Sequence, residues 1–430
     1  MRLRSFRITV EGDEAGACRS LLEAEGYRFE PEPFSDRCWR LAEEPSPLGG
    51  SLASYFGFVY IQDRSSMLPP LALAPAPGET VLDMCSSPGS KTGFLCQLAG
   101  PSGFVLANEA SHSRLFTLRS NLRAMNFLQA GTCSFEGQSL PLPAGSLACI
   151  QLDPPCSGWG TVEKHPQAAR LWQGDKIKPL VGLQRLLLHK AALLLKEGGR
   201  VVYSTCTTNS DENERQVAWA EAELGLVREP LEPFPGFRFE DREGSYGTLR
   251  VDGEKSGAQG FFVARLVKRG ATPPLPAQDG KGMGKGMGMG KGGARKPKAS
   301  APLQIVPRPS LACASFDPAR LPDGDAAAFA GTVRFLPRAS QALIPEGFVW
   351  QAAPLGRIGA GGFVPDARLR CLMPAEGPRI VLEETADLRR LLAGTSMASP
   401  IAGDEASLWW RDLPLGRVAL RRGRVVAAFS

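Results

Sequence analysis

The sequence predicts an α/β fold in which helices cover both faces of a parallel sheet. Between residues 79 and 267, apolar runs typical of buried strands alternate with segments whose apolar residues recur at helical spacing. Such alternation favours parallel strands joined by helical crossovers. Ligands of these sheets bind beyond the carboxyl ends of the strands, so we expect the loops after Met84, Glu109, Asp153 and Thr205 to meet at one cleft. The strand candidates are residues 79–84, 104–109, 147–153, 200–206 and 260–267, and the main helix candidates are 91–99, 111–125 and 180–194.

Changes in composition predict four segments along the chain. Residues 1–55 are expected to form a small α/β domain, and residues 56–268 hold the alternating pattern. Residues 269–302 are rich in Gly and Lys, and we expect a flexible linker there. Residues 303–430 contain short strand candidates and one helix candidate, 384–392, separated by Gly/Pro turns, which is typical of one or two small β-rich modules.

Composition narrows the class of protein. The hydrophobic content of 43% is that of a globular protein, and no apolar run is long enough to span a membrane. The first residues lack the pattern of a signal peptide, so a cytoplasmic location is expected. Ten cysteines include no CxxC pair, and only three histidines are present, so no metal site is expected. Six Lys/Arg lie within residues 280–300, which accounts for the net charge of +6, so net charge alone does not indicate RNA binding.

Residues 82–92, Leu-Asp-Met-Cys-Ser-Ser-Pro-Gly-Ser-Lys-Thr, form a loop of small residues between a strand and a helix. Small side chains let a ligand approach the backbone, and a helix N-terminus favours an anionic group. Neither the dinucleotide pattern GxGxxG nor a Walker A loop is present, and an ordinary strand–helix turn would explain this loop alone. Glu109 ends the next strand about 20 residues later, where a carboxylate can accept both ribose hydroxyls of an adenosyl ligand.

Asp153-Pro154-Pro155-Cys156 follows the strand candidate 147–153. The two prolines stiffen the loop and so fix the Asp153 carboxylate and the Cys156 thiol relative to a flat substrate. Trp159 in the same loop could stack on a base, but packing beneath the loop is the interpretation we favour.

Cys206 stands at the tip of the strand candidate 200–206, just before a helix that is expected to begin near Asn209. Asn209 with Glu212 resembles a capping box. A cysteine near a helix N-terminus has surroundings that stabilise a thiolate, although most single cysteines are structural. The position beyond a strand end argues for a reactive residue.

Two cysteines and one aspartate at a shared edge fit one particular chemistry. C5 of cytosine is a poor nucleophile until a thiolate adds to C6 of the ring. A carboxylate hydrogen-bonded to the ring nitrogens stabilises the developing charge. A second thiol can then assist loss of the C5 proton and release of the first cysteine.

In order and spacing, the motifs Asp-Met-Cys-Ser-Ser-Pro-Gly-Ser-Lys-Thr, Ala-Asn-Glu, Asp-Pro-Pro-Cys-Ser-Gly and Ser-Thr-Cys-Thr resemble the Sun (Nol/Nop) family of RNA 5-methylcytosine methyltransferases. The resemblance covers residues 55–267 and looks closest to the bacterial RsmF type, which acts on 16S rRNA. It implies a Rossmann-like class I methyltransferase sheet, an N-terminal domain of RNA-binding type and PUA-like C-terminal modules. It also implies Cys206 as the nucleophile, with Cys156 promoting release.

The resemblance further implies S-adenosyl-L-methionine as the cofactor and RNA as the partner, with the rRNA free or within the small ribosomal subunit. The sequence itself gives no oligomeric state; a monomer is expected, and neither a membrane nor a metal is expected as a partner. Glu136 stands where the family usually has aspartate and could still accept from the adenine amino group. The implied cofactor contacts are Cys85, Ser86, Ser87, Pro88, Gly89, Ser90, Lys91, Glu109, Glu136 and Asp153.

Other functions stay open at this point. The catalytic loops do not distinguish rRNA from tRNA, because target choice belongs to the flanking modules. An RNA-binding ribosome-assembly factor without catalysis is a further alternative, which the joint presence of Cys156, Cys206, Asp153 and Glu109 disfavours. DNA cytosine methylation is disfavoured because it needs no cysteine at position 206.

Overall fold

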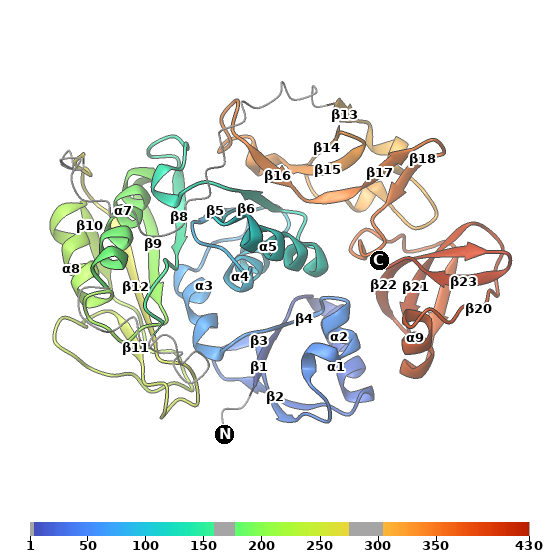
Figure 1. The fold of residues 1–430 in the computed structure, drawn as a ribbon, viewed down its shortest axis with the longest axis horizontal. Coiled ribbons are helices and arrows are strands. Elements are labelled where there is room, and N and C mark those ends of the chain that lie inside the picture. Colours follow the sequence, from blue (N-terminus) through green and yellow to red (C-terminus); the bar gives the residue numbers. More distant parts are fainter. Residues whose placement is uncertain (1–3, 159–176, 275–303, 430) are drawn as a thin grey trace.

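The computed structural model describes residues 4–158, 177–274 and 304–429, which form four β-sheets with helices against them (Figure 1). Most of the expected linker, from residue 275 to 302, lies outside the described residues, as does Trp159. None of the helices in the described residues is long and apolar enough to cross a membrane. The α-helices are α1 (Gly12–Ala24), α2 (Leu52–Tyr55), α3 (Leu68–Leu73), α4 (Ser90–Ala99), α5 (His112–Met125), α7 (Lys178–Leu194), α8 (Glu214–Glu223) and α9 (Thr385–Leu392).

The central sheet has nine strands and the order β10-β12-β9-β8-β5-β6-β7-β16, with β11 paired to β12. The five strands from β7 to β9 are parallel, and β10, β11, β12 and β16 run antiparallel to their neighbours. This confirms the predicted α/β sheet. The strands are β5 (Thr80–Asp83), β6 (Phe104–Asn108), β7 (Ala130–Cys133), β8 (Leu147–Leu152), β9 (Leu195–Thr205), β10 (Leu226–Glu229), β11 (Leu249–Val251), β12 (Phe261–Lys268) and β16 (Trp350–Ala352).

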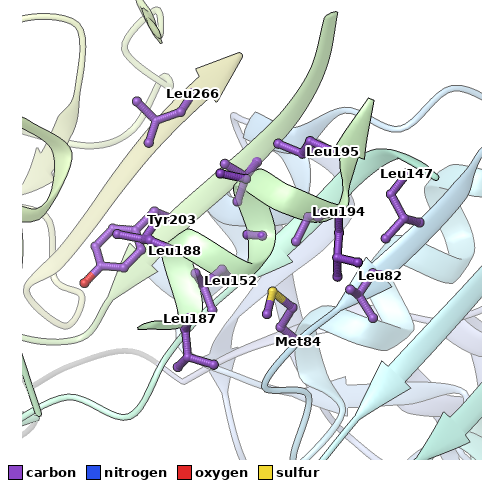
Figure 2. Packing of buried hydrophobic residues seen from close by; sticks show 14 of the residues in the cluster. Leu82, Met84, Leu147, Leu152, Leu187, Leu188, Leu194, Leu195, Tyr203 and Leu266 are labelled. Atoms are coloured by element: carbon purple, nitrogen blue, oxygen red, sulfur yellow. The ribbon is translucent and has the colours of Figure 1, made fainter. Parts of the chain in front are cut away.

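Successive side chains along each strand point to opposite faces of the central sheet, so its core consists of two layers, one on each face. Val81 of β5 faces a cluster with α3, α4 and α5, whereas Leu82 faces α7 and α8. Leu187, Leu188 and other leucines of α7 pack on the second face (Figure 2). Because both faces are covered, the carboxyl ends of the parallel strands are the open edge where a ligand can enter.

The N-terminal sheet has the order β2-β3-β1-β4 and packs against α1. Its strands are β1 (Ser5–Ile8), β2 (Arg28–Glu32), β3 (Ser35–Glu43) and β4 (Val59–Ile61), so it includes residues beyond the expected boundary at residue 55. Arg7 is fully buried, lies 5.0 Å from the centre of the Phe94 ring and hydrogen bonds to Gln97, which ties β1 to α4 of the central sheet.

The C-terminal region forms two five-stranded sheets, of orders β13-β14-β15-β17-β18 and β19-β21-β22-β23-β20. One strand of this region, β16, instead joins the central sheet beside β7, and the Trp350 ring occupies the space where a side chain at Gly131 would stand. The strands are β13 (Gln304–Val306), β14 (Gly324–Phe329), β15 (Thr332–Pro337), β17 (Pro354–Gly359), β18 (Gly362–Pro365), β19 (Arg379–Leu382), β20 (Met397–Ala398), β21 (Glu405–Trp410), β22 (Leu413–Arg421) and β23 (Arg424–Ala427).

The N-terminal sheet and the last C-terminal sheet share one hydrophobic core, and they lie side by side in Figure 1. Leu21 of α1 and Trp410 of β21 belong to the same buried cluster. Arg370 fastens this arrangement to the central sheet: its buried guanidinium donates to the carbonyl oxygens of Phe56 at 2.7 Å and Ala124 at 2.8 Å. The two ends of the chain are therefore one packing unit.

The expected capping box at Asn209 and Glu212 is wrong. Helix α8 begins at Glu214, and residues 209–213 form turns instead. Asn209 accepts a hydrogen bond from the backbone of Asp211, and the carboxylate of Glu212 is bound to Ser157. Because the Glu212 carboxylate binds the distant Ser157, it is not available to cap a helix in its own segment.

Candidate active site

The loops after five parallel strands converge on one cavity of about 270 Å³ at the carboxyl edge of the central sheet. The predicted loops after Met84, Glu109, Asp153 and Thr205 all contribute to it. The loop after β7 contributes as well, although β7 was not among the strands expected from the sequence. The site residues that line it are Cys85, Ser87, Glu109, Glu136, Asp153, Cys156 and Cys206.

Cys156 and Cys206 face each other across this cavity, with their sulfur atoms 3.2 Å apart. The hydrogen bond between them, which Cys156 donates, lowers the pKa of Cys206 below that of an ordinary thiol, against the effects of burial and Asp153. The same hydrogen bond, together with burial, raises the pKa of Cys156 well above its ordinary value. Of the two sulfurs, Cys206 therefore has the lower pKa and is the one that more readily forms a thiolate.

Cys85 is a third cysteine in the cavity lining, and its electrostatics differ from those of Cys206. Burial, followed by the charges of Asp83, Asp153 and Glu109, raises the pKa of the Cys85 thiol far above its ordinary value. A protonated thiol is a poor nucleophile at neutral pH. Among the three cysteines of the cavity, only Cys206 has surroundings that favour the reactive form.

Asp153 is held by two side chains from neighbouring elements. Lys91 of α4 lies 2.5 Å from one carboxylate oxygen, and the Ser204 hydroxyl of β9 donates to the other at 3.1 Å. Burial lowers the pKa of Lys91, but the charge and hydrogen bond of Asp153 outweigh it, so the ammonium pKa lies above its ordinary value. Lys91, expected as a cofactor contact, thus holds the carboxylate in place in this structure.

A buried network beneath the two cysteines joins their loops, and no local pattern in the sequence indicated it. Glu212 accepts the backbone N–H of Ser157 at 2.9 Å and the Ser157 hydroxyl at 2.5 Å. Gln184 of α7 donates to Glu212 at 3.0 Å, and the hydroxyls of Ser157 and Thr207 lie 2.8 Å apart. Ser157 follows Cys156 and Thr207 follows Cys206, so this network sets the spacing of the sulfurs.

The predicted cofactor loop contributes only part of its residues to the cavity wall. Cys85 and Ser87 line it, whereas Ser86 is turned inward, with its hydroxyl donating to the Asp83 carbonyl oxygen. Pro88, Gly89 and Ser90 are not in the lining; Gly89 has φ of 103°, and an added Cβ would lie 3.0 Å from Leu118. Gly89 is therefore required where the loop passes over α5 and enters α4.

Asp83 is fully buried below this loop and accepts a hydrogen bond from Thr92 at 2.7 Å. Burial raises the pKa of its carboxyl group to about 6, although the Thr92 hydrogen bond and Lys91 partly oppose that effect. Asp83 lies outside the cavity lining, so its part is to connect β5 with the first turn of α4.

Glu109 and Glu136 approach the cavity from the loops after β6 and β7. Glu109 is buried, accepts the backbone N–H of Ser111 at 2.9 Å and lies 3.5 Å from Arg114. Glu136 is exposed to the solvent. Both carboxylates point to a ligand with hydroxyl or amino donors rather than a phosphate.

Asn108 is a second residue whose part the sequence did not reveal, because Ala-Asn-Glu was interpreted only through its glutamate. Its buried amide donates to the carbonyl oxygens of Met84 at 3.1 Å and Phe135 at 2.9 Å, and it accepts from the Phe135 N–H. A single side chain thus fixes the loops after β5 and β7 relative to each other.

The charges of the lining fit a cationic ligand. Glu109, Glu136 and Asp153 face the cavity, and Arg114 is the only lysine or arginine of its described lining. Apolar side chains, including Met84, Leu183 and Leu187, form another part of the wall. A ligand that joins a flat apolar group to hydroxyls and a positive centre satisfies both parts.

A comparison with known proteins finds a matching family model and similar curated proteins. Residues 70–267 match the family model described as 16S rRNA methyltransferase RsmB/F. The chain is 38% identical over 264 residues to ribosomal RNA small subunit methyltransferase F of Shewanella loihica, covering 59% of this chain and 54% of that protein. It is 37% identical over 284 residues to the protein of the same name from Pectobacterium atrosepticum, covering 64% and 58%. The chain thus spans little more than half the length of these curated relatives.

Solved structures show the same fold. A methyltransferase homolog protein from Pyrococcus horikoshii is 30% identical with a TM-score of 0.55, and the match covers 62% of this chain and 87% of that one. NSun6 from the same organism is 19% identical with a TM-score of 0.55, covering 62% and 91%, which is a likeness of fold alone. The central sheet is therefore the expected Rossmann-like class I methyltransferase sheet.

Proposed function

We propose that the chain is a methyltransferase of the RsmB/F family and that it transfers a methyl group from S-adenosyl-L-methionine to C5 of a cytosine in RNA, namely 16S rRNA. The observation that carries this proposal is the pair of sulfurs 3.2 Å apart in a cavity that also holds the Asp153 carboxylate. Methylation of an oxygen or an exocyclic nitrogen needs no such pair, because those atoms are nucleophiles already.

The reaction begins with the thiolate of Cys206. Its sulfur forms a bond to C6 of the cytosine, and the electron pair of the C5–C6 double bond shifts by way of C4 toward N3. Asp153, held by Lys91 and Ser204, lies in the same cavity, and in its protonated form it donates to N3 of the ring, which takes up the displaced electron pair. C5 becomes enamine-like and is able to attack an electrophilic carbon.

S-adenosyl-L-methionine, when bound, supplies that carbon as the methyl group on its sulfonium. The three carboxylates of the lining fit its positive charge, and Glu109 fits its ribose hydroxyls. Met84, Leu183 and Leu187 offer an apolar surface for its adenine ring.

Release requires loss of the C5 proton and cleavage of the bond between Cys206 and C6. Cys156 is the group nearest to the reacting sulfur, so it promotes this elimination, and Cys206 leaves as a thiolate. The products are 5-methylcytosine, S-adenosyl-L-homocysteine and the original thiolate, and the C5 proton passes to a base or to water.

We assign the flanking regions, residues 1–55 and the PUA-like residues 303–430, to RNA binding in a monomeric enzyme, with residues 269–302 as a linker. The relatives named for ribosomal RNA support rRNA as the partner, either free or within the small subunit. Transfer to a tRNA cytosine is the alternative that the test below separates.

The test measures transfer of a labelled methyl group to 16S rRNA, to small ribosomal subunits and to tRNA, with the modified base identified by mass spectrometry. We expect 5-methylcytosine in rRNA with the wild-type protein and none with Cys206→Ala. Cys313→Ala, which removes a half-buried thiol from the C-terminal region, is the control and should retain activity. Normal 5-methylcytosine formation by Cys206→Ala would refute the mechanism, and methylation of tRNA alone would refute the substrate.

A further inference from the structure

A second cavity, of about 380 Å³, lies where the C-terminal region meets the central sheet. Helix α5 and strand β7 form one side of it, and β15, β16 and residues 353–369 form the other. It is the larger of the two cavities described here, and none of the catalytic side chains lines it. We call it the junction pocket.

Two arginines face this pocket from opposite sides, and neither has a carboxylate partner within the part of the chain that the structure describes. Arg119 of α5 donates to the Thr132 hydroxyl at 2.9 Å, and Arg334 of β15 donates to the Ala352 carbonyl oxygen at 2.8 Å. Arg123, a third arginine of the lining, is paired with Asp366 at 2.5 Å. The acid of the pocket is therefore already taken. Arg368, a fourth arginine of the lining, donates to the Tyr55 carbonyl oxygen at 2.9 Å and lies 4.8 Å from the centre of the Tyr55 ring, and Tyr55 does not line the pocket. The two charges left to the pocket are those of Arg119 and Arg334.

These two charges are close enough to affect each other. Burial lowers the pKa of Arg334, and the charge of Arg119 lowers it further. Burial also lowers the pKa of Arg119. Guanidinium groups remain charged at neutral pH, so the protein holds two like charges together in a half-buried place. An anion between them would remove that repulsion.

An exposed aromatic ring stands beside the arginines. Phe116 of α5 lines the pocket with 76% of its surface exposed to the solvent, and buried Phe127 and Leu122 continue its apolar wall. Exposed aromatic rings next to arginines are typical of sites that bind single-stranded RNA, where bases stack on rings and phosphates contact guanidinium groups.

Helix α5 connects the junction pocket with the catalytic cavity. Arg114 in its first turn lines the catalytic cavity, and Arg119 lines the junction pocket. Five residues of helix correspond to a rise of about 7.5 Å. An RNA strand whose target base enters the catalytic cavity could therefore follow α5 into the junction pocket.

We propose that the junction pocket binds a phosphodiester of the substrate RNA, with Arg119 and Arg334 contacting the phosphate and Phe116 contacting a neighbouring base. The identity of the ligand as RNA rests on the proposed function. The charge pattern, the open aromatic ring and the link along α5 are independent of the catalytic chemistry.

The test compares the double variant Arg119→Gln/Arg334→Gln with Lys196→Gln/Arg269→Gln. The control removes two exposed positive charges, at the start of β9 and just after β12, which are separated from β7 and β16 by other strands of the central sheet. RNA affinity is measured at several salt concentrations. We expect the pocket variant to bind RNA about tenfold more weakly at low salt, with a salt slope smaller by about 0.7 for each phosphate that the protein no longer neutralises. The control should match the wild type.

Methyl transfer supplies the second readout. With the pocket variant, KM for RNA should rise while kcat at saturating RNA and the affinity for S-adenosyl-L-methionine remain unchanged. Arg119→Lys/Arg334→Lys, which retains both charges, should recover most of the RNA affinity and so exclude a folding defect.

The two proposals fail in different ways. If the pocket variant has wild-type RNA affinity and salt slope and its methyl transfer is intact, the proposal that the junction pocket binds RNA is wrong. Absence of methyl transfer by the wild type, with the difference in RNA binding preserved, would overturn the proposed function and leave the pocket supported.

Discussion

The sulfur of Cys156 lies 3.2 Å from the sulfur of Cys206, and the hydrogen bond between them lowers the pKa of Cys206 and raises that of Cys156. The two cysteines come from different loops, after β8 and after β9, yet each sets the state of the other. In the proposed mechanism, the group that lowers the pKa of the nucleophile is also the group that later assists its release. Removing the Cys156 thiol should therefore affect both the pKa of Cys206 and the release of Cys206 from the product.

Cys156→Ala is expected to trap the covalent complex between Cys206 and RNA, because the group nearest to the bond that must break is gone. Denaturing gel electrophoresis after incubation with RNA and S-adenosyl-L-methionine should show a band of reduced mobility. The double variant Cys156→Ala/Cys206→Ala should show none. A Cys156→Ala variant that turns over at the wild-type rate without such a band would remove the release role.

Alkylation by iodoacetamide should reveal the thiolate of Cys206. In the wild type we expect the pH midpoint of the Cys206 reaction to lie below that of an ordinary thiol, because the hydrogen bond from Cys156 lowers its pKa. Cys156→Ala should move this midpoint upward, whereas Cys156→Ser, which retains a donor, should not. Mass spectrometry of the modified peptide gives the rate at each pH, and identical midpoints in all three proteins would contradict the assignment.

Glu212→Ala should lower kcat by about 100-fold, because small displacements of reacting groups have effects of that size. The substitution leaves the donors of Ser157 and Gln184 without their acceptor, so the two cysteine loops lose their spacing. Glu212→Gln retains an acceptor and should recover most activity. A purely structural role would lower stability without moving the alkylation midpoint of Cys206, and that midpoint is the measurement that decides.

Asp83→Asn should stabilise the protein more at pH 8 than at pH 5. Burial raises the folded-state pKa of Asp83 to about 6, so the stability it contributes is present at low pH and is lost as pH rises through that value. Between pH 5 and pH 8 the difference amounts to about 1.4 kcal/mol, because this interval spans about one pKa unit below the folded-state value.

Asp252→Asn is the control for this measurement. The backbone hydrogen bond of Lys255 lowers the pKa of Asp252, so any contribution from it is lost as pH falls and the trend runs in the opposite direction. Urea denaturation of the three proteins at both pH values checks the sign. Parallel pH dependences for wild type and Asp83→Asn would show that the carboxyl group is not buried as described.

Local patterns in the sequence were sufficient for the central sheet and for the reactive residues at its edge. A parallel strand is a short apolar run, and its carboxyl end is where a ligand binds, so Asp153 and Cys206 could be placed from the chain alone. That Asp153 and Cys206 line the same cavity could be predicted once the parallel sheet was predicted, because the carboxyl ends of its strands lie at one edge.

Contacts between distant segments could not be predicted in this way. Glu212 resembles a capping residue locally, and only the folded structure shows Ser157 as its partner. Strand β16 has three residues and no recognisable pattern, because its place beside β7 is set by Trp350 filling the space above Gly131. That Arg119 and Arg334 line the same pocket likewise depends on how the C-terminal region packs against α5.

The core shared by α1 and the last C-terminal sheet has a consequence for synthesis. Leu21 leaves the ribosome early, but the residues that cover its cluster, from Ile380 to Val425, are translated more than 350 positions later. At roughly 5–20 residues per second, that interval is on the order of tens of seconds. During this time the first sheet has an uncovered apolar side, so we expect the nascent chain to need chaperones until the last C-terminal sheet has been made.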